Sequence, residues 1–213
     1  MTDFTIIGSG AGGSAAALEL LENHYSVEIF EEGKNYNHEK MNMLEGLQTF
    51  WRNNGINLFF GEPILNFGEG KAIGGSTIIN GGVIADTSEK ILKLWDDQIN
   101  ENFFLNDEFF KICNDVKNIL VPKNQTNDNN IISGSSEILL KAAKAKKYKT
   151  KPTNLAFKET NIQHNGPFGC TSGSKNSLDK NYHNLIKKLG GRIESNSKVI
   201  KLKSNGNFIK KLI

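Results

Sequence analysis

A glycine-rich segment near the start of the sequence has the spacing of a phosphate-binding turn. Gly8, Gly10 and Gly13 fit the pattern G-x-G-x-x-G, with Ser9 and Ala11 at intervening positions. The first glycine permits a tight turn, the second lets the backbone approach a pyrophosphate, and the third lets a helix pack closely on a strand. Unpaired N–H groups at a helix N-terminus, together with the helix dipole, attract an anion. The segment therefore predicts a site for the pyrophosphate of a dinucleotide.

An acidic residue completes this pattern. Glu31 follows Gly13 by 18 residues and ends a predicted strand. A carboxylate at that place accepts hydrogen bonds from ribose hydroxyls and disfavours a 2′-phosphate. Its neighbour Glu32 is a second candidate, and we choose Glu31 because the strand ends there. The alternative is a tight strand–helix turn followed by an exposed glutamate, which the combined placement of glycines and acid disfavours.

A second glycine cluster occupies residues 70–83, with the sequence GKAIGGSTIINGGV. Its paired glycines allow a close approach of the backbone, and its serine and asparagine side chains offer hydrogen bonds to a phosphate or to a cofactor ring. A glycine-rich turn between strands is the alternative, but it would not explain why two glycine clusters flank one ordinary helical segment. The residues assigned to the cofactor here are Gly74, Gly75, Ser76, Asn80 and Gly81.

Three segments together resemble the glucose–methanol–choline (GMC) family of FAD-dependent oxidoreductases. Residues 70–83 resemble the family's GxxxGGSSxxN segment, which lies along the FAD pyrophosphate and reaches towards the flavin. Residues 166–200 look like the family's GCxxGxKxSxxxxYLxxAxxxGAxIxxNxxVxxI stretch, and by that resemblance Val199 contacts the adenine through its backbone. The resemblance runs from Phe4 to about Leu202. It departs from the family at His183, where a leucine is common.

The resemblance implies FAD as the cofactor and hydride transfer from a carbon bearing a hydroxyl group to the flavin. It implies an alcohol, a sugar or a choline-like molecule as the substrate of the completed enzyme, with a base that takes the hydroxyl proton. In the family, a His–His or His–Asn pair in a C-terminal half supplies this base. Nothing in the sequence corresponds to that half. We therefore assign no catalytic residue to the four histidines, which are His24, His38, His164 and His183.

These observations predict that residues 1–213 are the N-terminal portion of an FAD-binding domain, that the C-terminal substrate domain is absent, and that the chain alone is inactive. One alternative is a non-catalytic FAD-binding remnant, or a subunit that needs a second chain to complete it. Another is an NAD-dependent Rossmann protein, which is disfavoured because it would leave residues 70–83 without a purpose.

The elements that must position these residues form an α/β pattern. A strand at Phe4–Ile7, a helix over 11–23 and a strand over 26–30 make a βαβ unit, which implies a right-handed crossover and a parallel sheet. The turn residues 204–207, Ser-Asn-Gly-Asn, predict a hairpin near the C-terminus. We therefore predict an incomplete Rossmann-like FAD-binding fold, in which a parallel sheet has helices on both faces and a β-hairpin follows.

Other segments show helical or loop patterns. An apolar stripe over 43–51 predicts a helix that faces the core, and the periodicity over 91–120 predicts further helix with Cys113 in the core. The polar residues 122–130 predict an exposed loop. The lysines of a helix over 135–147 favour a solvated face over an anion site, because no aromatics or arginines interleave with them.

Composition excludes several classes of function. A formal net charge of +3 gives no sign of nucleic-acid binding. Cys113 and Cys170 stand far apart without CxxC or matching histidine spacing, so no metal site and no disulfide framework are predicted. The first residues show no signal peptide, and no apolar stretch is long enough for a membrane span. The expected location is the cytoplasm.

Overall fold

The computed structural model describes residues 2–35, 42–120, 134–150, 154–158, 166–168, 170, 172–206 and 208–213. The predicted loop at 122–130, together with His38 and His164, lies outside these residues. The chain divides into two compact units. Unit 1 comprises residues 1–81 and 164–213, and unit 2 comprises residues 82–163. Each unit is described by itself.

The centre of unit 1 is a three-stranded parallel sheet. Its strands are β1 (Phe4–Ile7), β2 (Val27–Phe30) and β7 (Arg192–Glu194), in the order β1-β2-β7. Helix α1 (Ala11–Glu22) connects β1 to β2, so the predicted βαβ unit and parallel sheet are confirmed. The third strand comes from near the end of the chain, where Ile193 pairs with Ile29.

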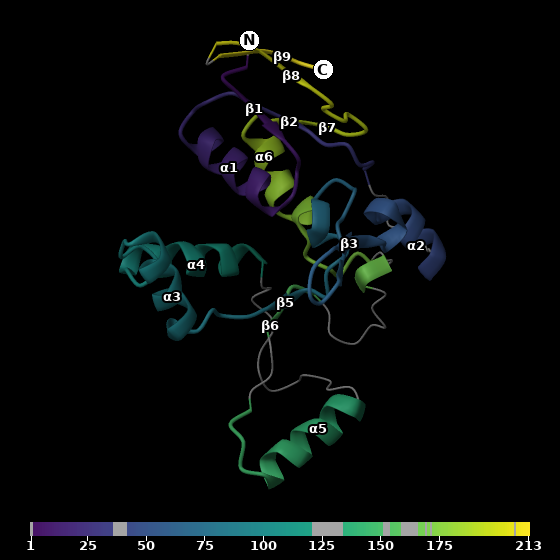
Figure 1. The fold of residues 1–213 in the computed structure, drawn as a ribbon, viewed down its shortest axis with the longest axis vertical. Helices are drawn as coiled ribbons and strands as arrows, with labels where there is room; N and C mark the ends of the chain where they lie inside the picture. The colour runs from purple at the N-terminus through teal and green to yellow at the C-terminus, as the bar shows by residue number, and fades with distance from the viewer. Residues whose placement is uncertain are drawn as a thin grey trace. The chain divides into compact units, whose positions relative to one another are not determined.

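Two helices cover one face of this sheet. Helices α1 and α6 (Tyr182–Lys188) contact each other as well as the strands, and both lie on the same side of β1, β2 and β7 (Figure 1). The buried residues of these helices include Ala17, Leu18, Leu21 and Ile186, and Val27 and Ile29 of β2 are buried as well. The predicted α/β fold, a parallel sheet with helices packed on it, is confirmed, and the two helices that contact the sheet in the described residues share one face.

The rest of unit 1 packs around a smaller apolar cluster. Helix α2 (Met43–Phe50) contributes Phe50, which is fully buried against Ala72, Ile78 and Ile79. The expectation that the whole stripe of this helix faces the core is wrong in part, since Met43 and Leu44 are 60% and 63% exposed. A periodic stripe shows which face is apolar, but it does not show whether the chain itself covers that face.

Short elements connect this cluster to the sheet. After α2 come the turn η1 (Arg52–Gly55) and the antiparallel hairpin of β3 (Asn57–Phe59) and β4 (Leu65–Phe67). The 3-10 turns η2 (Gly75–Thr77), η3 (Gly166–Phe168) and η4 (Leu178–Lys180) follow. At the end of the chain, β8 (Leu202–Asn205) and β9 (Phe208–Leu212) form the predicted hairpin.

Unit 2 is mostly helical. Its elements are β5 (Val83–Ile84), α3 (Glu89–Ile99), α4 (Asp107–Leu120), α5 (Gly134–Ala145) and β6 (Asn154–Leu155), and β5 pairs with β6. The predicted helical run is therefore two helices, and Cys113 on α4 is only half-buried rather than in a closed core. None of the helices in the described residues combines the length and the apolar character needed to cross a membrane.

The link between α3 and α4 depends on one buried carboxylate. Asp96 accepts hydrogen bonds from the backbone N–H groups of Phe103 (2.9 Å), Phe104 (2.8 Å) and Leu105 (3.2 Å). Trp95 packs edge-on against Phe104, with ring centroids 5.4 Å apart. The buried carboxylate thus pairs three consecutive backbone N–H groups and fixes the turn between the two helices.

We predict that Asp96→Ala lowers the free energy of unfolding of unit 2 by about 1–3 kcal/mol, because it removes a charged acceptor that three backbone N–H groups share. The matched control is Asp97→Ala, which removes only an exposed pair with Lys93 (3.1 Å) and should cost less than about 1 kcal/mol. Urea unfolding, followed by tryptophan fluorescence, measures both. Equal losses in the two variants would contradict the role of Asp96.

Candidate dinucleotide site

The first glycine segment forms the turn between β1 and α1. Gly8 has φ +94°, in the region that glycine favours, and its N–H donates to the Phe30 carbonyl at 2.8 Å. Gly10 precedes the first turn of α1, and Ala11 begins the helix. A Cβ at Gly13 would lie 2.1 Å from the Gly8 carbonyl oxygen, so only glycine permits this approach of helix to turn.

The second glycine segment lies directly against the first. A Cβ on Gly75 would come within 2.8 Å of the Gly10 Cα, so the two backbones meet where neither has a side chain. Gly74 has φ +96° and donates its N–H to the Ser9 hydroxyl at 3.0 Å. A Cβ on Gly10 itself would meet nothing within 4 Å. Open space therefore lies in front of Gly10, as a bound pyrophosphate would require.

The Glu31 side chain is 5% exposed and lies behind the turn. Its Oε2 accepts from the Ser9 N–H at 2.9 Å and from the Ser9 hydroxyl at 2.8 Å. Its Oε1 accepts from the Gly33 N–H at 2.8 Å. A carboxylate has about four acceptor positions, so these three donors leave one position at Oε1 for a ligand hydroxyl.

These elements surround a hollow of about 300 Å³ in unit 1. The predicted residues that line it are Gly8, Gly10, Glu31, Glu32, Gly75, Ser76 and Val199. Other predicted residues lie outside the lining, namely Ser9, Ala11, Gly13, Gly74, Asn80 and Gly81. Ser9 and Gly74 instead support the turn from behind, while Asn80 and Gly81 are exposed. The structure thus brings the first glycine segment, Gly75, Ser76 and Val199 together around the hollow. Asn80 and Gly81, at the end of the second segment, do not line it.

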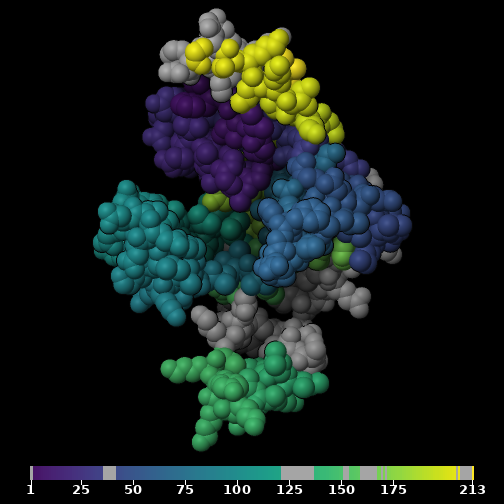
Figure 2. Space-filling model, viewed as in Figure 1, coloured from purple at the N-terminus to yellow at the C-terminus, as the bar shows by residue number. Residues whose placement is uncertain are grey.

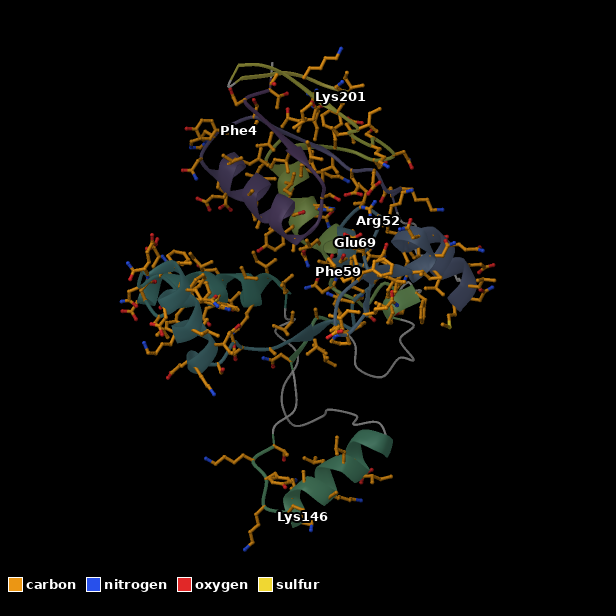
Figure 3. The ribbon with its side chains drawn as sticks, in the orientation of Figure 1. Phe4, Arg52, Phe59, Glu69, Lys146 and Lys201 are labelled. Carbon is orange, nitrogen blue, oxygen red and sulfur yellow. The ribbon has the colours of Figure 1, made fainter. Side chains whose placement is uncertain are left out.

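Sequence reasoning missed six lining residues, which are Ile7, Phe30, Arg52, Gly70, Ser197 and Lys198. Arg52 is the charged group among them that the fold holds most firmly. Its guanidinium pairs with Glu32 and, through Nε at 2.9 Å, with Glu69 (Figure 3). The hydrogen bond to Glu32 is the main cause that raises the pKa of Arg52. The one feature of the sequence that could have pointed to Arg52 is that the chain has only two arginines.

A buried lysine joins the third segment to the second. Lys175 is almost fully buried, and its Nζ donates to the carbonyl oxygens of Ile78 (2.7 Å) and Asn80 (2.6 Å). Burial disfavours the charged form and lowers the pKa of Lys175 to about 8. The lysine of the GxKxS pattern therefore fixes the backbone of the segment that ends in Asn80.

The parallel sheet, the glycine turn between β1 and α1 and the carboxylate after β2 define a dinucleotide-binding α/β protein. Residues 3–208 match the family described as GMC oxidoreductase. The chain belongs to this family, which confirms the resemblance seen in its three segments. The N-terminal domain of the family binds FAD, so the predicted cofactor is also confirmed. The open space at Gly10 and the acceptor position at Glu31 fit such a cofactor.

Known proteins similar to this chain are longer. An uncharacterized GMC-type oxidoreductase of Mycobacterium tuberculosis is 25% identical over 213 residues, which cover 92% of this chain and 32% of that protein. A cholesterol oxidase of Acinetobacter baumannii is 26% identical over 236 residues, which cover 94% of this chain and 41% of that protein. The crystal structure of pyridoxine 4-oxidase from Mesorbium loti has a TM-score of 0.63 at 14% identity, covers 100% of this chain and 45% of that one, and shares the fold. The chain thus spans about a third of the first relative and less than half of the other two.

We predict that Gly10→Val weakens FAD binding by about tenfold or more, because its side chain would occupy the space in front of the turn. Gly10 has φ −69°, which valine adopts without strain, so the variant should fold. Titration of the apo chain with FAD measures the effect. The matched control is Gly12→Ala, whose Cβ also meets nothing within 4 Å but which does not line the hollow. Wild-type affinity in Gly10→Val would contradict the site.

A second prediction concerns pH and Lys175. Its pKa is about 8 in the folded chain against 10.5 in the unfolded chain, so the unfolded state binds more protons between these values. The free energy of unfolding of the wild type should therefore rise between pH 8 and 10.5, by up to about 3 kcal/mol relative to two control variants. These are Lys175→Met and Lys175→Arg, which do not titrate at this position in this range. Urea unfolding across this pH range tests it. Parallel stability curves for all three proteins would show that folding does not lower the pKa of Lys175.

Proposed function

We propose that this chain is the FAD-binding portion of an oxidoreductase that removes hydride from a carbon bearing a hydroxyl group. The observation that carries the proposal is the approach of Gly75 to Gly10 beside the Glu31 carboxylate, which leaves open space in front of Gly10. Membership of the GMC oxidoreductases supports the reaction class. The relative from Acinetobacter baumannii is named as an oxidase of cholesterol, which is an alcohol.

Each predicted residue has a role in this proposal. Gly8, Gly10 and Ala11 present the backbone of the turn to the pyrophosphate, and Glu31 accepts a ribose hydroxyl. Val199 contacts the adenine through its backbone. Further roles fall to residues that support the others: Ser9 and Gly74 hold Glu31 and the turn, Gly13 seats α1, and Glu32 holds Arg52. Gly75, Ser76, Asn80 and Gly81 extend from the pyrophosphate towards the flavin.

When bound, FAD would supply the hydride acceptor. The residues of this chain would bind and orient it, but removal of the hydroxyl proton requires a positioned base. The two histidines in the described residues do not offer one. His24 ends the turn after α1, and His183 is buried within α6; neither lines the hollow. We propose that the base and the substrate-binding residues belong to a further portion of the enzyme.

Two exposed apolar surfaces of unit 1 support such a portion. Strand β1 is at the edge of the three-stranded sheet, and its residues Phe4 and Ile7 are 40% and 52% exposed. The hairpin of β3 and β4 lies at the surface, in blue in Figure 2. Its exposed apolar residues are Ile56, Leu58, Phe59, Phe60, Ile64 and Leu65. Unpaired strand edges and large apolar patches are typical of surfaces that another domain or chain covers.

The same surfaces favour the second candidate function, a non-catalytic FAD-binding subunit that works only when a second chain completes it. Both candidates bind FAD and differ in what supplies the base. The substrate in either case is a small alcohol or sugar.

We predict that the purified 213-residue chain binds FAD and that substrate does not reduce the bound flavin. Loss of a positioned base and of substrate orientation costs several orders of magnitude in rate. The experiment is anaerobic: FAD is added to the chain, then primary alcohols, a sterol, choline or an aldose, and the flavin absorption band is followed. Free FAD is the control. Absence of FAD binding would refute the function, and substrate-dependent bleaching would show that this chain carries its own base.

A further inference from the structure

His183 is a buried titratable residue that the proposed function has not used. It is 1% exposed and stands in the first turn of α6. Its Nε2 lies 2.9 Å from the Ser14 hydroxyl on α1 and 3.2 Å from the Ser9 carbonyl oxygen. The Ser14 hydroxyl in turn donates to the same Ser9 carbonyl at 2.8 Å. The imidazole and the hydroxyl therefore converge on one backbone oxygen of the glycine turn.

The hydrogen bonds determine the tautomer of this ring. Nδ1 is buried and has no hydrogen-bond partner among the described residues. A buried N–H without an acceptor is less favourable than an unused lone pair, so the proton belongs on Nε2. The Nε2–H group then donates to Ser14 and to the Ser9 carbonyl, while the Ser14 proton also goes to that carbonyl. Burial lowers the pKa of His183, which favours this neutral form.

The position of the Ser9 carbonyl fixes the next amide group. A trans peptide is planar, so the Ser9 C=O and the Gly10 N–H point in opposite directions. The carbonyl points into the protein, towards α1 and α6, because its two donors lie there. The Gly10 N–H makes no hydrogen bond within the described residues, and Gly10 lines the hollow.

We propose that His183 is a positioning residue for the cofactor: through Ser14 and the Ser9 carbonyl it holds the Gly10 N–H towards the hollow, where that group donates to the pyrophosphate. The inference rests on the proposed FAD site and adds a residue to it. A leucine at this position would fill the same space between α1 and α6, but it would leave the Ser9 carbonyl with Ser14 alone. His183 thus adds a second donor that holds the turn before the cofactor arrives.

The first test compares variants of the whole chain. His183→Leu should raise the dissociation constants for FAD and for ADP by about fivefold, the value of one hydrogen bond. His183→Gln places an amide N–H near the position of Nε2 and should restore both constants to within about twofold of wild type. Ser14→Ala should weaken binding by a similar factor. In the double variant His183→Leu/Ser14→Ala, the loss of binding free energy should not exceed the sum of the losses in the two single variants. Wild-type affinity in His183→Leu, or a folded Gln variant that restores nothing, would overturn the proposal.

A second measurement needs no bound cofactor. In ¹⁵N-labelled apo chain, the ring nitrogens of His183 should report the Nε2–H tautomer, and the Gly10 amide resonance should shift in His183→Leu but not in His183→Gln. An Nδ1–H tautomer, or an unmoved Gly10 resonance, would overturn the positioning role. If wild-type chain binds neither FAD nor ADP, the proposed function fails, and these resonances still decide whether His183 holds the turn.

Discussion

The buried carboxylate of Glu31 is the interaction on which the site depends. It accepts both the N–H and the hydroxyl of Ser9, and it also accepts the Gly33 N–H. Because the Ser9 hydroxyl also accepts the Gly74 N–H, one anion connects the first glycine turn, the end of β2 and the second glycine segment. Hydrogen bonds to a charged acceptor are stronger than neutral ones, and a buried charge requires them. The acid that we propose as the ribose acceptor is thus also the structural centre of the turn.

Three backbone contacts explain why this region contains so many glycines. A Cβ on Gly33 would lie 2.2 Å from the Ala72 nitrogen, and one on Gly70 would lie 2.4 Å from the Gly75 oxygen. The approach of Gly75 to Gly10 is the third contact. The Gly33 and Gly75 contacts each bring two chain segments together without a side chain between them, and the Gly70 contact folds the second glycine segment back on itself. Lys175 then fixes the far end of the same segment through two carbonyl groups.

The sequence was informative where a local pattern has a local consequence. The spacing of Gly8, Gly10 and Gly13 and the apolar runs around it predicted β1, α1, β2 and the turn that joins them. Arg52 was not predicted, because its place opposite Glu32 and Glu69 results from contacts between distant segments. The periodicity over 91–120 predicted helix, but it did not predict that Cys113 would be only half-buried, because how far a helix face is covered depends on packing within unit 2.

The pairing of β5 with β6 has a consequence for how this chain tolerates change. Val83 pairs with Leu155 and Ile84 with Asn154, so a short ladder joins the start of unit 2 to residues 154–155. The Ala156 N–H also donates to the Gly82 carbonyl at 2.7 Å, which extends this pairing by one hydrogen bond. Residues 82–84 and 154–156 are thus held side by side within unit 2, as the ends of an inserted module are. We therefore expect insertions and deletions between Ile84 and Asn154 to leave the register of β1, β2 and β7 unchanged.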